Sequence, residues 1–189
     1  MRARVLVVVG LVLAAALAGC TAEHKITDTI PRADSALQAC PEQTEEPVAK
    51  GSALPALSFE CPGGGSLDLG RAPGVPTVVN LWGSWCPPCR EELPLLQQFA
   101  DDAGDRVRVL GIISKDGVPQ AESFATDAGV TFPNAYDAVG QLMAELGINA
   151  LPYTAFIAAD GTLVHSEIGP VDSVDELRGL VAQHLGVQL

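Results

Sequence analysis

The hydrophobic positions of this chain fall into short apolar runs, separated by turns rich in glycine and proline. Continuous β-branched runs and alternating runs predict strands; these are 56–60, 66–69, 77–82, 107–113, 153–158 and 162–168. Apolar residues spaced by three and four predict helices; these are 91–103, 118–128, 138–146 and 173–185. Because strands and helices alternate over most of the chain, the pattern indicates an α/β protein.

The order of the elements predicts how the sheet is built. Strand–helix–strand units favour parallel pairing, with helices on both faces of a central sheet. A glycine-rich turn joins the first two strands in an N-terminal hairpin, and Ala159-Asp160-Gly161 joins the last two. The late hairpin adds antiparallel strands, so we expect a mixed central sheet. The sequence thus predicts one three-layer α/β domain over residues 51–189.

The N-terminus has the pattern of a bacterial export signal. Two arginines precede an uncharged stretch at 5–19, which is too short for a membrane span and suits a signal-peptide core. The stretch ends in L-A-G-C at Cys20, which resembles the lipobox of lipoproteins, where the cysteine is lipidated and the chain is cut before it. We expect a signal peptide at 1–19, lipidation of Cys20, and a polar tether at 20–50. The protein would then lie lipid-anchored on the extracytoplasmic face of the cell membrane; an uncleaved anchor helix is the alternative.

Charge and cysteine usage narrow the function classes. The formal net charge of −12 argues against nucleic acid as a partner, because no basic stripe is present to neutralise phosphates. Disulfides persist outside the cytoplasm. Without Cys20, four cysteines remain, which allow three pairings. If the two cysteines of the CxxC motif pair with each other, Cys40 is left to pair with Cys61 in a structural disulfide.

The stretch LWGSWCPPCREELP at 81–94 carries the candidate chemistry. Cys86 follows a buried-strand pattern, and Pro87 and Pro88 are suited to a first helical turn, so we expect Cys86 at a helix N-terminus. There the helix dipole lowers the pKa of a thiol and favours the thiolate. Cys89 lies one turn later and could resolve a mixed disulfide. A zinc knuckle would need a second ligand pair with similar spacing, so we expect no metal.

These residues resemble those of thioredoxin-fold proteins, in particular the exported TlpA/ResA-like thiol–disulfide oxidoreductases. The resemblance covers most of residues 51–189. It is carried by W-G-S-W-C-P-P-C, by the Asp160-Gly161 turn, and by Leu151-Pro152-Tyr153-Thr154, which is similar to the family's cis-proline loop. The segment 118–146 resembles the peroxiredoxin/TlpA-type insertion that distinguishes this branch from minimal thioredoxins. The resemblance implies a thioredoxin-like three-layer fold.

The resemblance also implies roles for individual residues. A cis bond before Pro152 would expose the backbone of Leu151 beside the thiols, so that a substrate chain could pair with it like an added strand. Trp85 would shape the exposed rim and, together with Pro87 and Pro88, contact the substrate. Minimal thioredoxins have a buried aspartate where this chain has Asn80. In the ResA-like branch a glutamate at the position of Glu92 tunes the thiols, so we expect this residue to accept a proton from Cys89.

The sequence therefore predicts a membrane-tethered thiol–disulfide oxidoreductase without a cofactor. The ResA-like resemblance implies a reductant in cytochrome c maturation, with apocytochrome c as substrate and a membrane protein as electron donor. The alternatives are an oxidant or isomerase in secretory folding, a thiol peroxidase, and a metallochaperone. Peroxidases of related fold have threonine or serine where this chain has Gly83, and copper chaperones of this fold use CxxxC.

Overall fold

A computed structural model of the protein describes residues 35 and 37–189. The expected signal peptide, the expected lipidation of Cys20 and the first part of the expected tether lie outside the described residues. Within the described part of the chain, no helix has both the length and the hydropathy that a membrane span requires.

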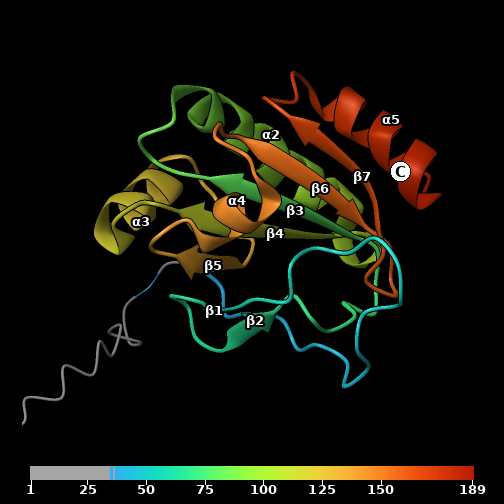
Figure 1. Ribbon diagram of the computed structural model, residues 1–189. Helices are drawn as coiled ribbons and strands as arrows, with labels where there is room; N and C mark the ends of the chain where they lie inside the picture. The colour runs from blue at the N-terminus through green and yellow to red at the C-terminus, as the bar shows by residue number, and fades with distance from the viewer. Residues whose placement is uncertain (1–34, 36) are drawn as a thin grey trace, which may run out of the picture.

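Two sheets and five helical segments make up the domain (Figure 1). The strands are β1 (Ser58–Glu60), β2 (Ser66–Asp68), β3 (Thr77–Trp82), β4 (Arg108–Ser114), β5 (Asn134–Asp137), β6 (Tyr153–Ile157) and β7 (Leu163–Ile168). The helices are α2 (Pro87–Ala103), η2 (Gly104–Arg106), α3 (Val118–Asp127), α4 (Gln141–Leu146) and α5 (Val174–Leu185). The central sheet has the order β5-β4-β3-β6-β7, and β1 and β2 form a separate antiparallel hairpin.

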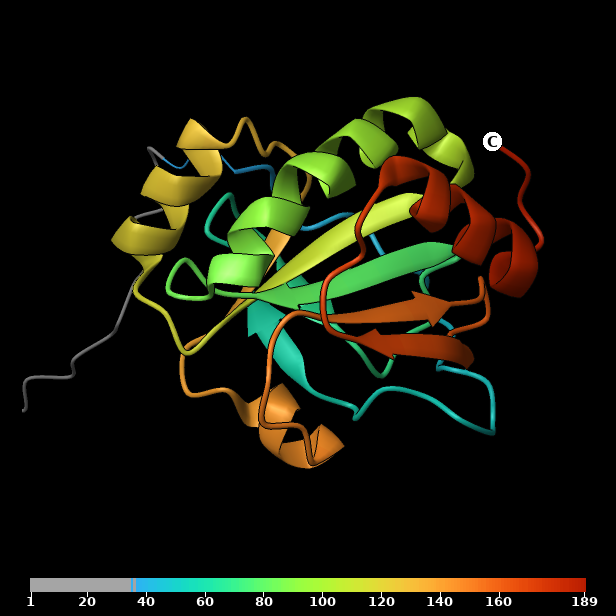
Figure 2. The ribbon, with the colours of Figure 1, turned by 90° about the horizontal axis from the view of Figure 1, so that it is seen from above.

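The central sheet is mixed, as the sequence predicts. Strands β3, β4 and β5 are parallel, whereas β6 runs antiparallel to β3 and β7 antiparallel to β6. Figure 2 shows α2 and α5 on one face of the sheet, with α4 and the hairpin on the other. The thioredoxin-like α/β fold, with helices on both faces, is therefore confirmed.

Strand β3 lies in the middle of the sheet, where its mostly apolar residues are buried on both faces. Every one of them is buried, and the aliphatic ones pack in a core that continues into α2 and β4. Since β4 lies on one side of β3 and β6 on the other, the residues that follow β3 are flanked by the ends of both neighbours. The residues that follow β3 include the two cysteines of the CxxC motif.

Strand β5 was not expected from the sequence, and helix α4 starts later than the pattern 138–146 predicts. Strand β5 begins with Asn134 and ends with Asp137, and polar residues at these positions are typical of a loop. Both side chains are nevertheless buried and hydrogen-bonded. Asn134 Oδ1 accepts a hydrogen bond from the indole of Trp82, and the carboxylate of Asp137 accepts from the first two N–H groups of α4. A hydrogen bond from distant Trp82 and a local cap on α4 thus satisfy the polar ends of a strand that the local pattern does not indicate.

The segment before residue 51 lies against the domain from Leu37 onward. Leu37 is buried, and the backbone N–H of Cys40 donates to the carbonyl of Gly64 at 2.8 Å. Cys40 and Cys61 are joined in a disulfide. The glycine-rich turn leaves room for this contact, because a Cβ at Gly63 would come within 2.2 Å of the Leu37 carbonyl oxygen. The three glycines after Cys61 thus allow the preceding chain to pack directly on the hairpin.

Candidate active site

The two thiols of the CxxC motif lie where the central strand ends and helix α2 begins. The chain leaves β3 after Trp82, makes a short turn, and reaches Cys86, which is the N-cap residue of α2. Pro87 and Pro88 hold the first two helical positions, where a backbone N–H would have no partner inside the helix. Cys86 and Cys89 are joined in a disulfide, so the structure shows the oxidised form.

The start of α2 favours negative charge on the Cys86 sulfur. The backbone N–H of Cys89 donates to Cys86 Sγ at 3.3 Å, and the positive end of the helix dipole points the same way. In the reduced protein these groups would stabilise a thiolate. Cys86 is 3% exposed and Cys89 is fully buried, so Cys86 is the outer sulfur. Both cysteines belong to the hydrophobic core cluster that also contains Leu151.

The loop before β6 lies beside the thiols and leaves backbone groups without partners. Tyr153 pairs with Leu81, so the start of β6 is adjacent to the end of β3. The Leu151–Pro152 peptide bond is cis, as the sequence predicts, and the carbonyl of Pro152 accepts from the N–H of Gly169 at 2.9 Å. Among the described residues, the N–H and C=O of Leu151 have no backbone partner.

Glu92 is buried in the core, one helical turn after Cys89. Its side chain is 1% exposed, whereas its neighbour Glu91 is exposed to solvent. One carboxylate oxygen, Oε1, accepts from the backbone N–H of Val171 at 3.0 Å. The other, Oε2, accepts from Asn80 Nδ2 at 2.9 Å. The Glu92 carboxyl thus joins three distant parts of the chain below the disulfide.

The environment of Glu92 changes its acidity. Burial raises the pKa of the Glu92 carboxyl from its ordinary value of 4.5 to about 7, although the hydrogen bonds from Val171 and Asn80 act in the opposite direction. A carboxyl with this pKa exchanges protons at neutral pH, as a general acid or base near a thiol must do. Its burial also shows that Glu92 is not a solvated residue of the helix surface.

Two polar residues from the sheet complete the surroundings of Glu92. Asn80 Nδ2 donates a second hydrogen bond to Thr154 Oγ1 at 2.9 Å, and both residues are fully buried. Asn80 Oδ1 has no partner in the described structure. Sequence reasoning noticed Asn80 but missed Thr154 and Val171. These lie 74 and 91 positions after Asn80, and no local pattern links them to it.

The turn between β3 and α2 is positioned by the loop that follows β4. The carboxylate of Asp116 accepts hydrogen bonds from the backbone N–H groups of Ser84 and Gly117. Tyr136 on β5 donates through its hydroxyl to the Asp116 carbonyl at 2.7 Å. Sequence reasoning did not single out Asp116, although a polar residue just after a parallel strand lies at the edge where sites form in α/β sheets.

Trp85 forms the exposed rim of the site. It is 52% exposed, and its indole N–H donates to the carbonyl of Ser114 at 3.3 Å. The ring lies over Gly83, where an added Cβ would meet Trp85 Nε1 at 2.6 Å. Ile168, at the end of β7 on the same edge of the sheet, is 66% exposed. Trp82, in contrast, is fully buried and belongs to the core.

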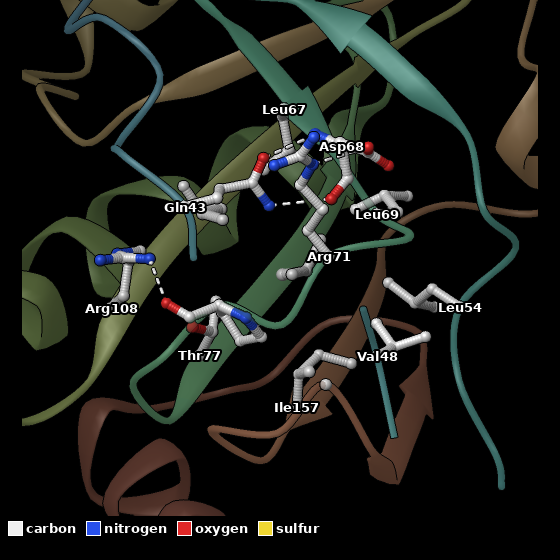
Figure 3. A pocket seen from close by; sticks show the side chains of 14 residues that line it. Gln43, Val48, Leu54, Leu67, Asp68, Leu69, Arg71, Thr77, Arg108 and Ile157 are labelled. Atoms are coloured by element: carbon white, nitrogen blue, oxygen red, sulfur yellow. Dashed lines mark hydrogen bonds and ion pairs between the residues drawn. The ribbon is translucent and has the colours of Figure 1, made fainter. Parts of the chain in front are cut away.

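A cavity lies at the opposite edge of the sheet, away from the thiols. It has a volume of about 30 Å³ and lies between the hairpin and the first residues of β3 and β4 (Figure 3). Its guanidinium groups already have partners, since Arg71 pairs with Asp68 and Glu45 and Arg108 donates to the Pro73 carbonyl. The candidate site is therefore the edge that carries Cys86.

Comparison with known proteins gives the same assignment as the geometry. The family model described as Redoxin matches residues 49–181. The chain belongs to the Redoxin family. It is 32% identical over 117 residues to the thiol:disulfide interchange protein DsbE of Allochromatium vinosum, which covers 60% of this chain and 64% of that protein. It is 26% identical over 121 residues to the thiol-disulfide oxidoreductase ResA of Bacillus subtilis, covering 64% of this chain and 68% of that protein.

Among solved structures, this redoxin resembles a secreted disulfide oxidoreductase of Mycobacterium tuberculosis that is homologous to E. coli DsbE. The identity is 31%, the TM-score is 0.60, and the match covers 68% of this chain and 96% of that one. The redoxin chain spans less than two thirds of the length of the Allochromatium relative. The likeness therefore shows the family of the chain and the fold of its sheet.

The redoxin site has the groups that thiol–disulfide exchange requires. A thiolate at Cys86 can attack one sulfur of a partner disulfide, forming a mixed disulfide and releasing the other partner sulfur as a thiolate. After losing its proton, Cys89 can attack Cys86 Sγ and release the second partner thiolate. This sequence transfers two electrons to the partner and ends in the disulfide seen here. The reverse sequence oxidises a partner dithiol.

Proposed function

We propose that this protein is a thiol–disulfide oxidoreductase that exchanges disulfides with protein thiols through Cys86 and Cys89. One observation carries the proposal: Cys86 caps helix α2, and its sulfur accepts the N–H of Cys89. Such a position activates a thiol and places the resolving thiol within reach. The relatives named as thiol:disulfide interchange proteins support it.

In this proposal Glu92 accepts the proton of Cys89 when the mixed disulfide is resolved. The two residues are three apart on one helix and therefore share a side of it. Because the pKa of Glu92 is about 7, the carboxyl can take up a proton at neutral pH and release it afterwards. Trp85, Pro87, Pro88 and the backbone of Leu151 would contact the substrate chain.

The direction that we propose is reduction of partner disulfides, in the service of cytochrome c maturation. The proposal rests on the similarity to the ResA-like branch, because Pro-Pro, Asn80 and Glu92 match its pattern. A reductant outside the cytoplasm must be recharged, so the proposal includes a membrane protein that donates electrons. Oxidation or isomerisation of disulfides in secreted proteins is the alternative within the same chemistry.

A lipid-anchored location on the extracytoplasmic face is part of the same proposal. It rests on the sequence from the N-terminus to Cys20 alone. Replacing Cys20 with alanine should release the protein from the membrane fraction of cells that express the full chain. Retention of the Cys20→Ala protein in that fraction, with the N-terminal segment uncleaved, would instead indicate an anchor helix.

Trapping of mixed disulfides tests the function and its direction. In a Cys89→Ala variant the mixed disulfide on Cys86 cannot be resolved, so partners stay bound and can be identified after non-reducing electrophoresis. We expect cytochrome biogenesis proteins, and a reduction potential near that of thioredoxin, roughly −270 mV. Capture of many secreted proteins, with a potential near −120 mV, would favour an oxidant. Absence of any mixed disulfide would contradict the proposed function.

A further inference from the structure

A polar groove lies beside the thiols, between the start of α2 and helix α3. Its volume is about 390 Å³. Ser84 and Arg90 line it from the active-site side, and Gln120, Ser123 and Phe124 line it from α3. Phe124 also packs against the buried Trp82, so the α3 wall is anchored to the core. The groove therefore starts from the same turn that presents Cys86.

Arg90 lines this groove one helical turn after the reactive cysteine. It follows Cys86 by four positions in α2, and its backbone N–H donates to the Cys86 carbonyl at 3.2 Å. Residues four apart are neighbours on a helix surface, with Cβ atoms about 5–6 Å apart. A substrate residue next to the cysteine that is bonded to Cys86 would therefore come close to Arg90.

The guanidinium of Arg90 is positioned but not hydrogen-bonded. Its Cζ lies 4.6 Å from the centroid of the Phe124 ring, in a cation–π contact. The other arginines of the described chain have polar partners: Arg71, Arg106, Arg108 and Arg178. Within residues 37–189, Arg90 is the arginine whose side chain makes neither a hydrogen bond nor an ion pair. Its planar donors are thus available to a ligand.

Among the residues that line the groove, Arg90 is the cation, and it lies at the thiol end. Asp116 lies near that end, but its carboxylate already accepts two backbone N–H groups. Asp127 also lines the groove, at the last position of α3 and one turn beyond Phe124. An acidic side chain immediately beside the substrate cysteine would meet Arg90, whereas one placed farther along the groove would meet Asp127. The protein as a whole is acidic, so this cation gives local selectivity.

The topology of the sheet assigns the groove to one flank of the substrate. Cys86 follows β3, which lies between β6 and β4. The free backbone of Leu151 is on the β6 side, and α3 follows β4 on the other side. A chain bonded to Cys86 would therefore have one flank at Leu151 and the other at Arg90. We propose that the groove between Arg90 and α3 binds an aspartate or glutamate side chain adjacent to the target cysteine of a polypeptide substrate. The inference deepens the proposed function and depends on it.

Exchange with matched peptides tests this inference. Three peptides would share one sequence and carry a single cysteine as a mixed disulfide with thionitrobenzoate. They would differ only beside the cysteine, with glutamate before it, glutamate after it, or glutamine at both positions. Attack by reduced Cys86 on the peptide sulfur releases coloured thionitrobenzoate and leaves the peptide on the protein. Cys89 then releases the peptide thiol. A substitution that changes the reactivity of the Cys86 thiol alters the rates with the glutamate and glutamine peptides equally. Such a change therefore cancels in the ratio of the two second-order rate constants.

We expect one of the two glutamate peptides to react about fivefold faster than the glutamine peptide at low salt, the scale of a favourable exposed charge pair. The ratio of the glutamate rate to the glutamine rate should fall toward one in the Arg90→Gln variant. It should also fall toward one in 1 M salt, where the Debye length is about 3 Å. Lys50→Gln is the matched control. It removes one charge from an exposed residue whose neighbour Ala49 bonds to the β6–β7 turn, at the opposite edge of the sheet. The preference should persist in this variant.

The outcomes separate the inference from the proposed function. Equal rates for all three peptides with the wild-type protein would overturn the Arg90 inference and leave thiol exchange intact. A preference for glutamate that survives in Arg90→Gln would also overturn it, since another cation would then be responsible. Failure of every peptide to release thionitrobenzoate would refute the proposed function itself. Phe124→Leu should reduce the preference only in part, because the guanidinium would lose its support but keep its charge.

Discussion

The two disulfides of this protein join the same kind of atoms in very different surroundings. Cys86 and Cys89 are three residues apart, at a helix start on the edge of the central sheet. Cys40 and Cys61 are 21 residues apart and join an extended segment to a small hairpin. A backbone N–H donates to one sulfur of the first pair, and a buried carboxyl lies one turn below it. The second pair belongs to no helix.

The comparison shows that the role of a disulfide depends on what surrounds it. A short ring at a helix start restricts the unfolded chain little. Once the ring is reduced, the helix start stabilises the Cys86 thiolate beside its resolving thiol. A bond across a longer loop restricts the unfolded chain more and stabilises the fold. We therefore expect Cys86 and Cys89 to carry out disulfide exchange and the Cys40–Cys61 disulfide to stabilise the fold. Four experiments test this difference in role.

The largest effect should follow removal of the outer thiol. We expect Cys86→Ser to lower the rate of disulfide exchange by roughly 10³-fold or more, because the nucleophile is lost. Reduction of a model protein disulfide, followed by turbidity or fluorescence, measures the rate. The matched control is the double variant Cys40→Ser/Cys61→Ser, which should keep most of the activity. If the double variant lost exchange as completely as Cys86→Ser, the division between the disulfides would be wrong.

Removal of the second disulfide should act on stability. For a loop of this length, the entropy estimate predicts that Cys40→Ser/Cys61→Ser lowers the free energy of unfolding by about 3 kcal/mol. Denaturant titration of the double variant and of the wild-type protein, both with Cys86 and Cys89 oxidised, measures the difference. Equal midpoints and slopes for the two proteins would show that this bond does not stabilise the fold.

The buried carboxyl should make the stability of the protein depend on pH. The pKa of Glu92 is about 7 in the folded protein and 4.5 in its ordinary environment, so the folded state binds the proton more tightly. Stability should therefore fall as pH rises from about 4.5 to 7, by an amount on the order of 3 kcal/mol, and level off above that range. Glu92→Gln should remove this fall.

The neighbouring glutamate provides the control for this titration. Glu91→Gln removes a carboxyl from the next position of α2, which is exposed, and should keep the dependence on pH. Glu92→Gln should remain folded, because the amide of Asn80 can turn its unpartnered Oδ1 toward the introduced N–H group. Denaturant titrations of the oxidised proteins at several pH values distinguish the variants. A dependence on pH that is the same in Glu92→Gln and wild type would exclude the carboxyl as its source.

The smallest effect should come from the exposed rim. Trp85→Ala removes a half-exposed aromatic side chain next to Cys86. We expect kcat/KM for a polypeptide substrate to fall about threefold to tenfold, which corresponds to about 1 kcal/mol. The loss should be smaller with oxidised dithiothreitol, which is too small to reach the rim. Trp85→Phe should lie between alanine and wild type. Equal losses for both substrates would mean that Trp85 acts on the thiols and not on the substrate.

Much of the site could be predicted because its signals are local. A β-branched strand followed by C-P-P-C places Cys86 at a helix start, since proline is favoured at the first helical positions and cannot occupy the middle of a buried strand. The Leu151-Pro152 motif likewise predicted the cis-proline loop before β6. The short strand β5 could not be predicted, because the partner of Asn134 is Trp82 on another strand. The later start of α4 follows from Asp137, whose carboxylate accepts the N–H groups of Gln141 and Leu142.

The sequence by itself determined the central strand, the helix that presents Cys86, and the CxxC pattern of a redox protein, because each follows from neighbours along the chain. Only the tertiary structure decided the acidity of Glu92, since that depends on burial and on N–H groups from Val171 and Asn80. It also decided that Arg90 rests on Phe124 with its donors free. The physical reason is the same in both cases: desolvation and the positioning of charges arise from packing between segments that are distant in sequence.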